Sequence, residues 1–154
     1  MALNDILSQP AVFPALRVGS KKQALQELSA KAAALLNRDE REIFETLNSR
    51  ERLGSTGVGN GIAIPHGKLP KMDKLFGLFA RLEKPIDFEA LDGEPVDLIF
   101  LLLAPEAAGA DHLKALARVA RLLRDPEAAK KLRGSRDATA LYAILNGTAA
   151  SNAA

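Results

Sequence analysis

The residues best suited to chemistry in this 154-residue chain are two histidines and one arginine. His66 stands between Pro65 and Gly67, directly after the short apolar segment 62–64. We therefore expect its imidazole at the end of a strand, where Gly67 leaves the ring open to a partner. A neutral imidazole in that place can act as a nucleophile, a general base or a metal ligand. A purely structural histidine is the alternative.

The other two candidates fall on predicted helices. His112 opens a helix over 112–124, where free amides and the helix dipole favour a bound phosphate and a neutral imidazole. At roughly 100° per residue, Arg50 lies about 20° from Ile43, on the inward face of an earlier helix. An inward arginine needs an anionic partner. That partner is either a ligand or an acidic side chain of the protein. For His112 the alternative is a solvent-exposed residue in the first turn of its helix.

The segment 54–67 (GSTGVGNGIAIPHG) has no formally charged residue and holds five of the eleven glycines. Alternating glycines can direct backbone amides into one anion-binding hollow. We expect phosphate-binding groups here, contributed by Ser55, Thr56, Gly57, Gly59 and Gly61. Neither the dinucleotide fingerprint nor the P-loop spacing is present, so a nucleotide site is not expected. A flexible loop that leads into a short strand is the alternative.

Composition removes several other classes of function. The chain has no cysteine, which excludes disulfides, thiolate metal sites and cysteine nucleophiles. Helical zinc motifs and the serine-hydrolase elbow are absent, so we expect neither a metal nor a cofactor. The 21 basic and 19 acidic residues are interspersed and there is no tryptophan, which disfavours nucleic acid as a partner.

Hydropathy predicts a cytoplasmic protein without membrane insertion. The longest purely apolar run, 98–104, is far shorter than the roughly 20 residues that cross a bilayer. The first residues lack the basic start and apolar stretch of a signal peptide.

The N-terminal part of the chain predicts one edge strand and two helices. An apolar segment interrupted by proline, 11–18, is typical of an edge strand. Apolar residues at helical spacing predict a helix over 21–36 with Ser20 as its N-cap. A second helix is expected to start at Asn37, with Glu40 completing a capping box, and to end near Leu53.

The rest of the chain predicts central strands followed by helices. The apolar segments 75–82 and 96–104 have strand length and no polar face, which is typical of strands covered on both sides. Whether the stretch 85–95 between them forms a hairpin is open. A third helix should bury one stripe, made of Leu113, Leu116, Ala117, Ala120 and Leu123. Pro126 begins a shorter helix, and Ser135 caps the last one.

This order of elements predicts an α/β fold, a single-domain layered structure with a mixed β-sheet flanked by helices. We expect one domain over residues 1–147 and a disordered tail over 148–154.

Three segments make the sequence recognisable: SRERLGSTGVGNGIAIPHGK (49–68), PIDFEALDGEPVDLIFLLLAP (85–105) and the helix that opens at His112. Together they resemble the phosphotransferase-system (PTS) IIA domains of the fructose/mannitol class, type 2, and are most similar to its nitrogen-regulatory branch. The resemblance covers residues 7–147. It implies that His66 receives a phosphoryl group from the phosphohistidine of HPr or of a nitrogen-branch HPr-like carrier. His112 and Arg50 match the other two active-site residues of that class.

The resemblance further implies a regulatory phosphocarrier, whose two states bind regulatory target proteins differently and affect nitrogen, carbon or potassium balance. A chain with no fused IIB domain or membrane segment favours this reading. We expect some of Leu69, Met72 and Leu75 to contact the donor, and Lys68 or Lys71 to steer it.

Three alternatives are open. The first is a sugar-specific IIA component that passes phosphate to a IIB domain for fructose- or mannitol-type uptake. The second is a metal-dependent hydrolase that uses His66 and His112. The third is a structural interaction domain in which the glycine segment is only scaffold.

Overall fold

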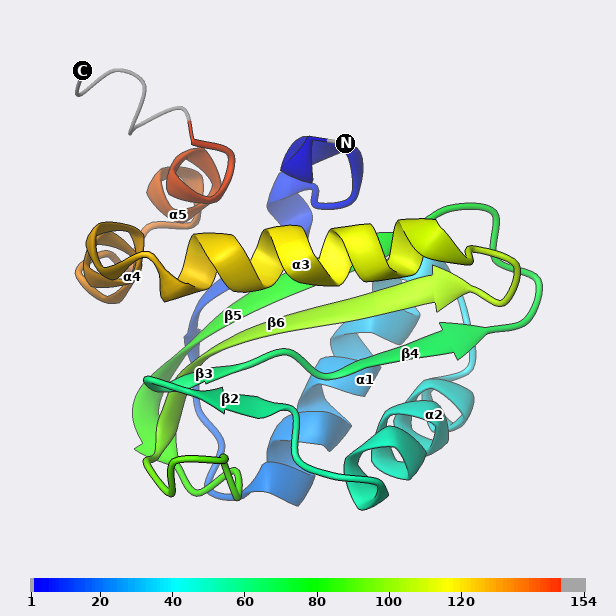
Figure 1. The fold of residues 1–154 in the computed structure, drawn as a ribbon, viewed down its shortest axis with the longest axis horizontal. Coiled ribbons are helices and arrows are strands. Elements are labelled where there is room, and N and C mark those ends of the chain that lie inside the picture. The colour runs from blue at the N-terminus through cyan, green and yellow to red at the C-terminus, as the bar shows by residue number, and fades with distance from the viewer. Residues whose placement is uncertain (1, 148–154) are drawn as a thin grey trace.

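A six-stranded mixed β-sheet with helices on both faces forms the centre of the computed structural model, which describes residues 2–147 (Figure 1). The strand order is β1-β5-β6-β3-β2, and β4 also pairs with β6. The strands are β1 (Val12–Leu16), β2 (Gly57–Gly59), β3 (Ile62–Ala63), β4 (His66–Leu69), β5 (Phe76–Ile86) and β6 (Val96–Pro105). This arrangement confirms the predicted α/β fold class. The expected tail, 148–154, lies outside the described residues.

Five α-helices surround the sheet within the described part of the chain. They are α1 (Lys21–Leu36), α2 (Glu40–Arg52), α3 (Ala110–Arg124), α4 (Pro126–Arg133) and α5 (Ala138–Leu145), and two short 3-10 helices (Leu3–Asp5 and Gln9–Ala11) precede β1. Helices α1 and α2 lie behind the sheet in Figure 1, and α3 crosses its front. The site described below lies where α2 and α3 approach the two sides of β4.

Strand β6 is the most buried element, as its apolar sequence predicts. Apart from Asp97 and Pro105, every residue of β6 is buried. It pairs antiparallel with β5, so the stretch between them does connect a hairpin. Strand β5 continues to Ile86, beyond the expected end, with an irregular register between Arg81 and Ile86. The core packs around β5 and β6 and includes the fully buried rings of Phe79, Phe88 and Phe100.

The sequence predicts polar N-caps at Ser20, Asn37 and Ser135. The structure has a different N-cap in the last two cases. Ser20 does cap α1, because its side chain accepts from the Gln23 N–H. Asn37 does not begin α2: it has a left-handed backbone (φ 54°) that ends α1, and Asp39 caps α2 instead. The last helix is capped by Asp137, whose carboxylate accepts from the Ala140 N–H. Ser135 only accepts from the N–H of Asp137 and lies two residues before the cap.

The buried stripe of α3 is also rotated relative to the prediction. The buried residues are His112, Ala115, Val119 and Leu123, whereas Leu113 is 68% exposed and Ala117 is exposed. Leu116 and Ala120 are only partly buried. Leu123 is buried as predicted, but the rest of the predicted stripe lies one residue too far along the helix, because a polar residue, His112, takes the inward position in the first turn.

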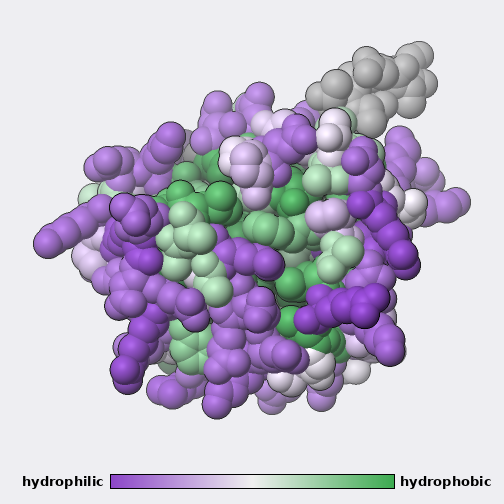
Figure 2. All heavy atoms as spheres, turned by 180° about the vertical axis from the view of Figure 1, so that it is seen from behind, coloured by the Kyte–Doolittle hydropathy of each residue, from purple (hydrophilic) through white to green (hydrophobic). Residues whose placement is uncertain are grey.

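On the face opposite to that of Figure 1, hydrophobic residues gather near the centre and hydrophilic side chains surround them (Figure 2). Among residues 2–147, no helix has both the length and the apolar character needed to cross a membrane.

Candidate active site

His66 begins β4, which continues the line of β3 after a break. The pairing offset with β6 is the same on both sides of the break, since Ile62 lies opposite Leu98 and His66 opposite Leu102. Pro65 has no N–H to give to the ladder, which explains the interruption. The sequence predicts His66 just after the end of a strand. It instead stands at the first position of a strand held by β6, so its backbone is fixed.

Both nitrogens of the His66 ring have a partner. Nδ1 lies 2.8 Å from the carbonyl oxygen of Ile64. A carbonyl oxygen can only accept, so Nδ1 carries the proton and Nε2 keeps its lone pair. Nε2 in turn accepts from Nε of Arg50 at 3.3 Å. The free lone pair of the imidazole therefore points toward a cation.

Arg50 reaches His66 from the last turn of α2. Its Nη1 donates to the carbonyl oxygen of Gly54 at 2.8 Å, which holds the guanidinium against the loop that follows the helix. Arg50 is partly buried, as its inward position predicted. Its two partners in the structure, an imidazole nitrogen and a carbonyl oxygen, are neutral. The positive charge is therefore available to an incoming anion.

His112 faces His66 from the first turn of α3. The two ring centroids lie 5.6 Å apart at an interplanar angle of 64°. His112 is only 8% exposed. Within the described part of the chain, its Nε2 is buried and has no hydrogen-bond partner. A buried polar atom without a partner is costly, so this nitrogen is suited to a ligand that arrives between the two rings.

The surroundings of both rings lower their pKa and so favour the neutral form. Burial lowers the pKa of His66, and the charge of Arg50 lowers it further, while the Ile64 hydrogen bond and the Glu51 carboxylate act in the opposite direction. Burial also lowers the pKa of His112, with additional contributions from His66 and Lys68. A neutral His66 is the form that has a nucleophilic lone pair at neutral pH.

The alternating glycines form a hairpin rather than one hollow. Gly57–Gly59 pairs antiparallel with Ile62–Ala63. Asn60 and Gly61 connect the strands with positive φ values of 58° and 79°, as a two-residue hairpin turn requires. At about 3.3 Å per residue, Gly61 lies roughly 16 Å along the strand from His66. The structure therefore does not bring Gly59 and Gly61 to the histidines.

Ser55 and Thr56 lie closer to the site, but their side chains hold the loop. The Ser55 hydroxyl donates to the carbonyl oxygen of Phe88 and accepts from the Gly57 N–H. The Thr56 hydroxyl and N–H both donate to the carboxylate of Glu51. Any contribution of these two residues to phosphate binding must therefore come with a change of partners.

Glu51 and Lys21 are the residues that the sequence analysis missed. The Glu51 side chain is 3% exposed, and its Oε1 lies 3.0 Å from Nζ of Lys21. Lys21 also stands over the ring of Phe88. The available signal was an acidic residue in the last turn of a helix, where the helix dipole disfavours it.

Gly67 has a different role from the one expected. A side chain at Gly67 would point to α2, where its Cβ would lie 2.5 Å from Cγ2 of Thr46. This glycine therefore lets β4 and α2 approach each other, which is what brings His66 and Arg50 within reach.

The apolar residues around the site are only partly those expected. Leu69 is fully buried, so it cannot contact a donor. Met72 and Leu75 are partly buried and line a pocket of about 530 Å³, which also includes Asp111, the residue before His112. Leu53, directly after α2, is 85% exposed, and Leu113, directly after His112, is 68% exposed. Two exposed leucines thus stand next in sequence to the arginine-bearing helix and the second histidine.

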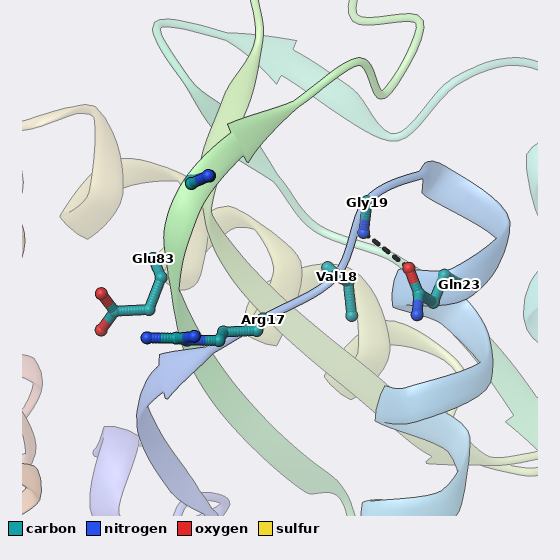
Figure 3. A pocket seen from close by; sticks show the side chains of 6 residues that line it. Arg17, Val18, Gly19, Gln23 and Glu83 are labelled. Carbon is teal, nitrogen blue, oxygen red and sulfur yellow. Dashed lines mark hydrogen bonds between the residues drawn. The ribbon is translucent and has the colours of Figure 1, made fainter.

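Two other features bear on the open alternatives. Residues 2–147 contain no group of three or more His, Asp or Glu side chains arranged to hold a metal ion. A second pocket, about 550 Å³ in volume, lies at the start of α1 (Figure 3) and contains no histidine. Its lining is Arg17, Val18, Gly19, Gln23, Glu83 and Lys84, and the Gly19 N–H donates to Oε1 of Gln23 there.

Comparison with known proteins identifies the family. Residues 5–147 match the family described as "Phosphoenolpyruvate-dependent sugar phosphotransferase system, EIIA 2". The chain is 68% identical over 145 residues to a nitrogen regulatory protein of Bradyrhizobium diazoefficiens, covering 94% of this chain and 95% of that protein.

Comparison with solved structures supports the same family. The crystal structure of nitrogen regulatory protein IIA-Ntr from Neisseria meningitidis superposes with a TM-score of 0.88 at 36% identity, covering 93% of this chain and 98% of that one. Enzyme IIA-Mtl from Escherichia coli, solved in complex with phosphorylated enzyme IIB-Mtl, has a TM-score of 0.75 at 15% identity, covering 92% and 99%. The latter likeness shows the fold alone. The chain belongs to the EIIA type 2 family of the phosphotransferase system, whose members carry a phosphoryl group on a histidine, and its relatives include nitrogen regulatory proteins.

Proposed function

We propose that this protein is a regulatory histidine phosphocarrier in which Nε2 of His66 accepts the phosphoryl group. One observation supports this assignment most directly: Nδ1 is occupied by the Ile64 carbonyl, while the lone pair of Nε2 faces Arg50, and the ring of His112 lies 5.6 Å from that of His66. The nitrogen that can attack is thus the one surrounded by groups that bind an anion.

In the proposed step, Nε2 attacks phosphorus in line with the bond to the donor histidine. The new N–P bond forms as the old one breaks, and its electron pair returns to the donor imidazole. His66 keeps its Nδ1 proton, so the ring becomes cationic, and the Ile64 carbonyl stabilises that proton. The transferred group carries its negative charge on the peripheral oxygens, where catalysis is chiefly positioning and charge stabilisation.

Arg50 and His112 supply that stabilisation. Arg50 is bound to Nε2 itself, so the guanidinium must move from the nitrogen to a phosphoryl oxygen as the N–P bond forms. The unpartnered Nε2 of His112 can hydrogen-bond to another oxygen. Neither group requires a metal or a nucleotide.

We propose HPr or a nitrogen-branch HPr-like phosphocarrier as the donor, and regulatory target proteins as the recipients of the signal, in the cytoplasm. We assign docking of the donor to the exposed Leu53 and Leu113 and to the partly buried Met72 and Leu75. The exposed Lys68 and Lys71 can steer an acidic donor, and charge reversal at either should then slow association.

The identity to nitrogen regulatory proteins favours a regulatory output over sugar uptake. An output in nitrogen, carbon or potassium balance is part of this proposal. In the sugar-specific alternative His66 accepts the phosphoryl group in the same way. The difference is that His66 then passes it to a IIB domain.

The test is reconstitution of the chain with phosphoenolpyruvate, enzyme I and the HPr-like carrier. We expect one acid-labile phosphate per chain, lost in His66→Ala and formed slowly in His112→Ala. Label that is retained in His66→Ala would refute the site. Rapid sugar phosphorylation by fructose- or mannitol-specific membranes would instead identify a transport IIA. A chain that takes up no phosphate, and whose partners ignore His66→Ala, would be a structural interaction domain.

A further inference from the structure

The feature with no role in the proposed transfer is the buried carboxylate of Glu51. Its two oxygens accept three interactions: from the Thr56 N–H at 3.0 Å, from the Thr56 hydroxyl, and from Nζ of Lys21 at 3.0 Å. With 3% of the side chain exposed, this is the most buried acid among the ion pairs of the described residues. An acid so placed is strongly destabilised unless every interaction is satisfied.

Both members of the pair stand at the wrong ends of their helices. Lys21 is the first residue of α1, where the helix dipole disfavours a cation, and Glu51 is in the last turn of α2, where it disfavours an anion. Burial adds to the cost of each charge. Local helix energetics therefore do not account for this pair, which points to a role outside the two helices.

Three hydrogen bonds connect Glu51 to the nucleophile by way of the backbones of Thr56 and Ile64. The Thr56 N–H donates to Glu51, and the carbonyl oxygen of Thr56 accepts from the Ile64 N–H at 3.0 Å. The carbonyl oxygen of Ile64 then accepts from Nδ1 of His66 at 2.8 Å. These bonds hold the Thr56 and Ile64 backbones, and with them the Ile64 carbonyl, in place against Nδ1, while the charge of the Glu51 carboxylate acts on the ring through space.

We infer that Glu51 is a positioning residue that keeps the His66 proton on Nδ1, through Thr56 and Ile64, and so leaves Nε2 free to accept phosphate. Its effect on transfer rests on the proposed function, whereas its effect on the tautomer does not. Lys21 secures the carboxylate at this position, and Glu51 never touches the transferred group.

The geometry also explains why the two active-site contacts come from neighbouring residues. Arg50 binds Nε2 directly, and Glu51 acts on Nδ1 by holding the backbones of Thr56 and Ile64. One turn at the end of α2 thus controls both nitrogens of the same ring. The Gly54 carbonyl, which accepts from Arg50, lies in the loop that the Glu51–Thr56 contact holds.

The test is two-bond ¹H–¹⁵N NMR of the imidazoles in the full-length, ¹⁵N-labelled protein without phosphate, which distinguishes a protonated ring nitrogen from one with a lone pair. We expect His66 in the wild type as the Nδ1–H form. In Glu51→Ala we expect a mixture of both tautomers, and a phosphoryl acceptance rate about tenfold lower, comparable to the loss of one hydrogen bond. An unchanged Nδ1–H form in a folded Glu51→Ala protein would overturn the inference.

Glu51→Gln removes the charge of residue 51 but keeps a side chain that can hydrogen-bond. It is the second test of the inference and replaces the first if Glu51→Ala does not fold. The amide can still accept from Thr56 but carries no charge. Since the Glu51 charge raises the pKa of His66, the NMR titration midpoint of His66 should move to lower pH in this variant. An unmoved midpoint would contradict the inference.

The matched control is Glu45→Gln on the same helix. Its carboxylate is 63% exposed and pairs with Arg41 on the surface. This variant should leave the tautomer and the midpoint of His66 unchanged. A wild-type protein with the Glu51-dependent tautomer but no phosphate uptake would refute the proposed function and leave this inference standing.

Discussion

Nε of Arg50 lies 3.3 Å from Nε2 of His66, so a guanidinium covers the attacking nitrogen before any phosphate arrives. The contact holds the ring in place and keeps its lone pair directed at a cation. It also means that acceptance of the phosphoryl group exchanges one partner of Arg50 for another. A group that rests on the nucleophile and then moves to the transferred oxygens needs little reorganisation of the surrounding protein.

Arg50 can be tested against a neighbour on the same turn. We expect Arg50→Gln to lower the rate of phosphoryl acceptance by about 10²-fold, the order found when one preorganised donor is removed. Arg52→Gln is the matched control, because Arg52 is exposed and is absent from the hydrogen bonds around His66. Rapid-quench measurement with the phosphorylated carrier gives both rates. Equal rates for the two variants would remove Arg50 from the site.

The lowered pKa values predict how unfolding depends on pH. The unfolded histidines titrate near 6.5, and burial lowers the pKa of both His66 and His112 in the folded protein. Below pH 6.5 the unfolded chain therefore binds more protons than the folded one, and stability falls as pH falls through the folded pKa values. Above pH 6.5 this contribution is fully present. Denaturant unfolding at a series of pH values should show the loss, and it should be smaller in the His66→Ala, His112→Ala double variant.

The same shift predicts the pH range of transfer. Since His66 stays neutral below the pH at which a free histidine protonates, the acid limb of the acceptance rate should lie below pH 6.5. A limb at or above that value would mean that the ring is not desolvated in solution. The pH dependence of the acceptance rate can also include titration of the carrier. Repeating the measurement with Glu51→Gln distinguishes the two, because this variant should shift only the limb that is due to His66.

Gly67→Ala tests the close approach of β4 to α2. The added methyl would meet Thr46 Cγ2, and neighbouring β6 restrains the strand from moving away. We expect a loss of about 1–3 kcal/mol in the free energy of unfolding, typical of overpacking. Acceptance should slow as well, because separation of β4 from α2 moves His66 away from Arg50. Thr46→Ser removes the obstructing methyl, so the double variant should recover part of both losses.

The exposed leucines provide a test of docking. We expect Leu53→Ser together with Leu113→Ser to weaken binding of the carrier on the order of tenfold, since both are exposed apolar residues beside site elements. Leu35→Ser is the control, as Leu35 is exposed on α1, which contributes no residue to the histidine pair. Calorimetric titration with the unphosphorylated carrier measures the affinities. Equal affinities in all three proteins would place the docking surface elsewhere.

Local sequence patterns determined the elements and the three candidate side chains. The apolar strands around Phe79 and Phe100, the Ser20 cap and the inward angle of Arg50 all depend on residues a few positions apart, which is the range over which periodicity and capping act. The run that contains His66 was distinctive for the same reason. The predicted strands, the Ser20 cap and the inward position of Arg50 agree with the structure because the physical cause is contained in the segment itself.

Only the tertiary structure decided what surrounds the imidazole. His112 rather than Leu113 faces inward because α3 is oriented by its packing on the sheet, and helix periodicity alone cannot choose between adjacent stripes. The partners of Glu51, which include Lys21 thirty residues earlier, depend on where α1 and α2 end relative to each other. Asn60 and Gly61 are consistent in sequence with a loop that binds an anion, and the antiparallel pairing of β2 with β3 places them in a hairpin turn instead. Contacts between segments far apart in the chain produce no periodic pattern in the sequence. The hydrogen bonds that set the His66 tautomer therefore follow only from the tertiary structure.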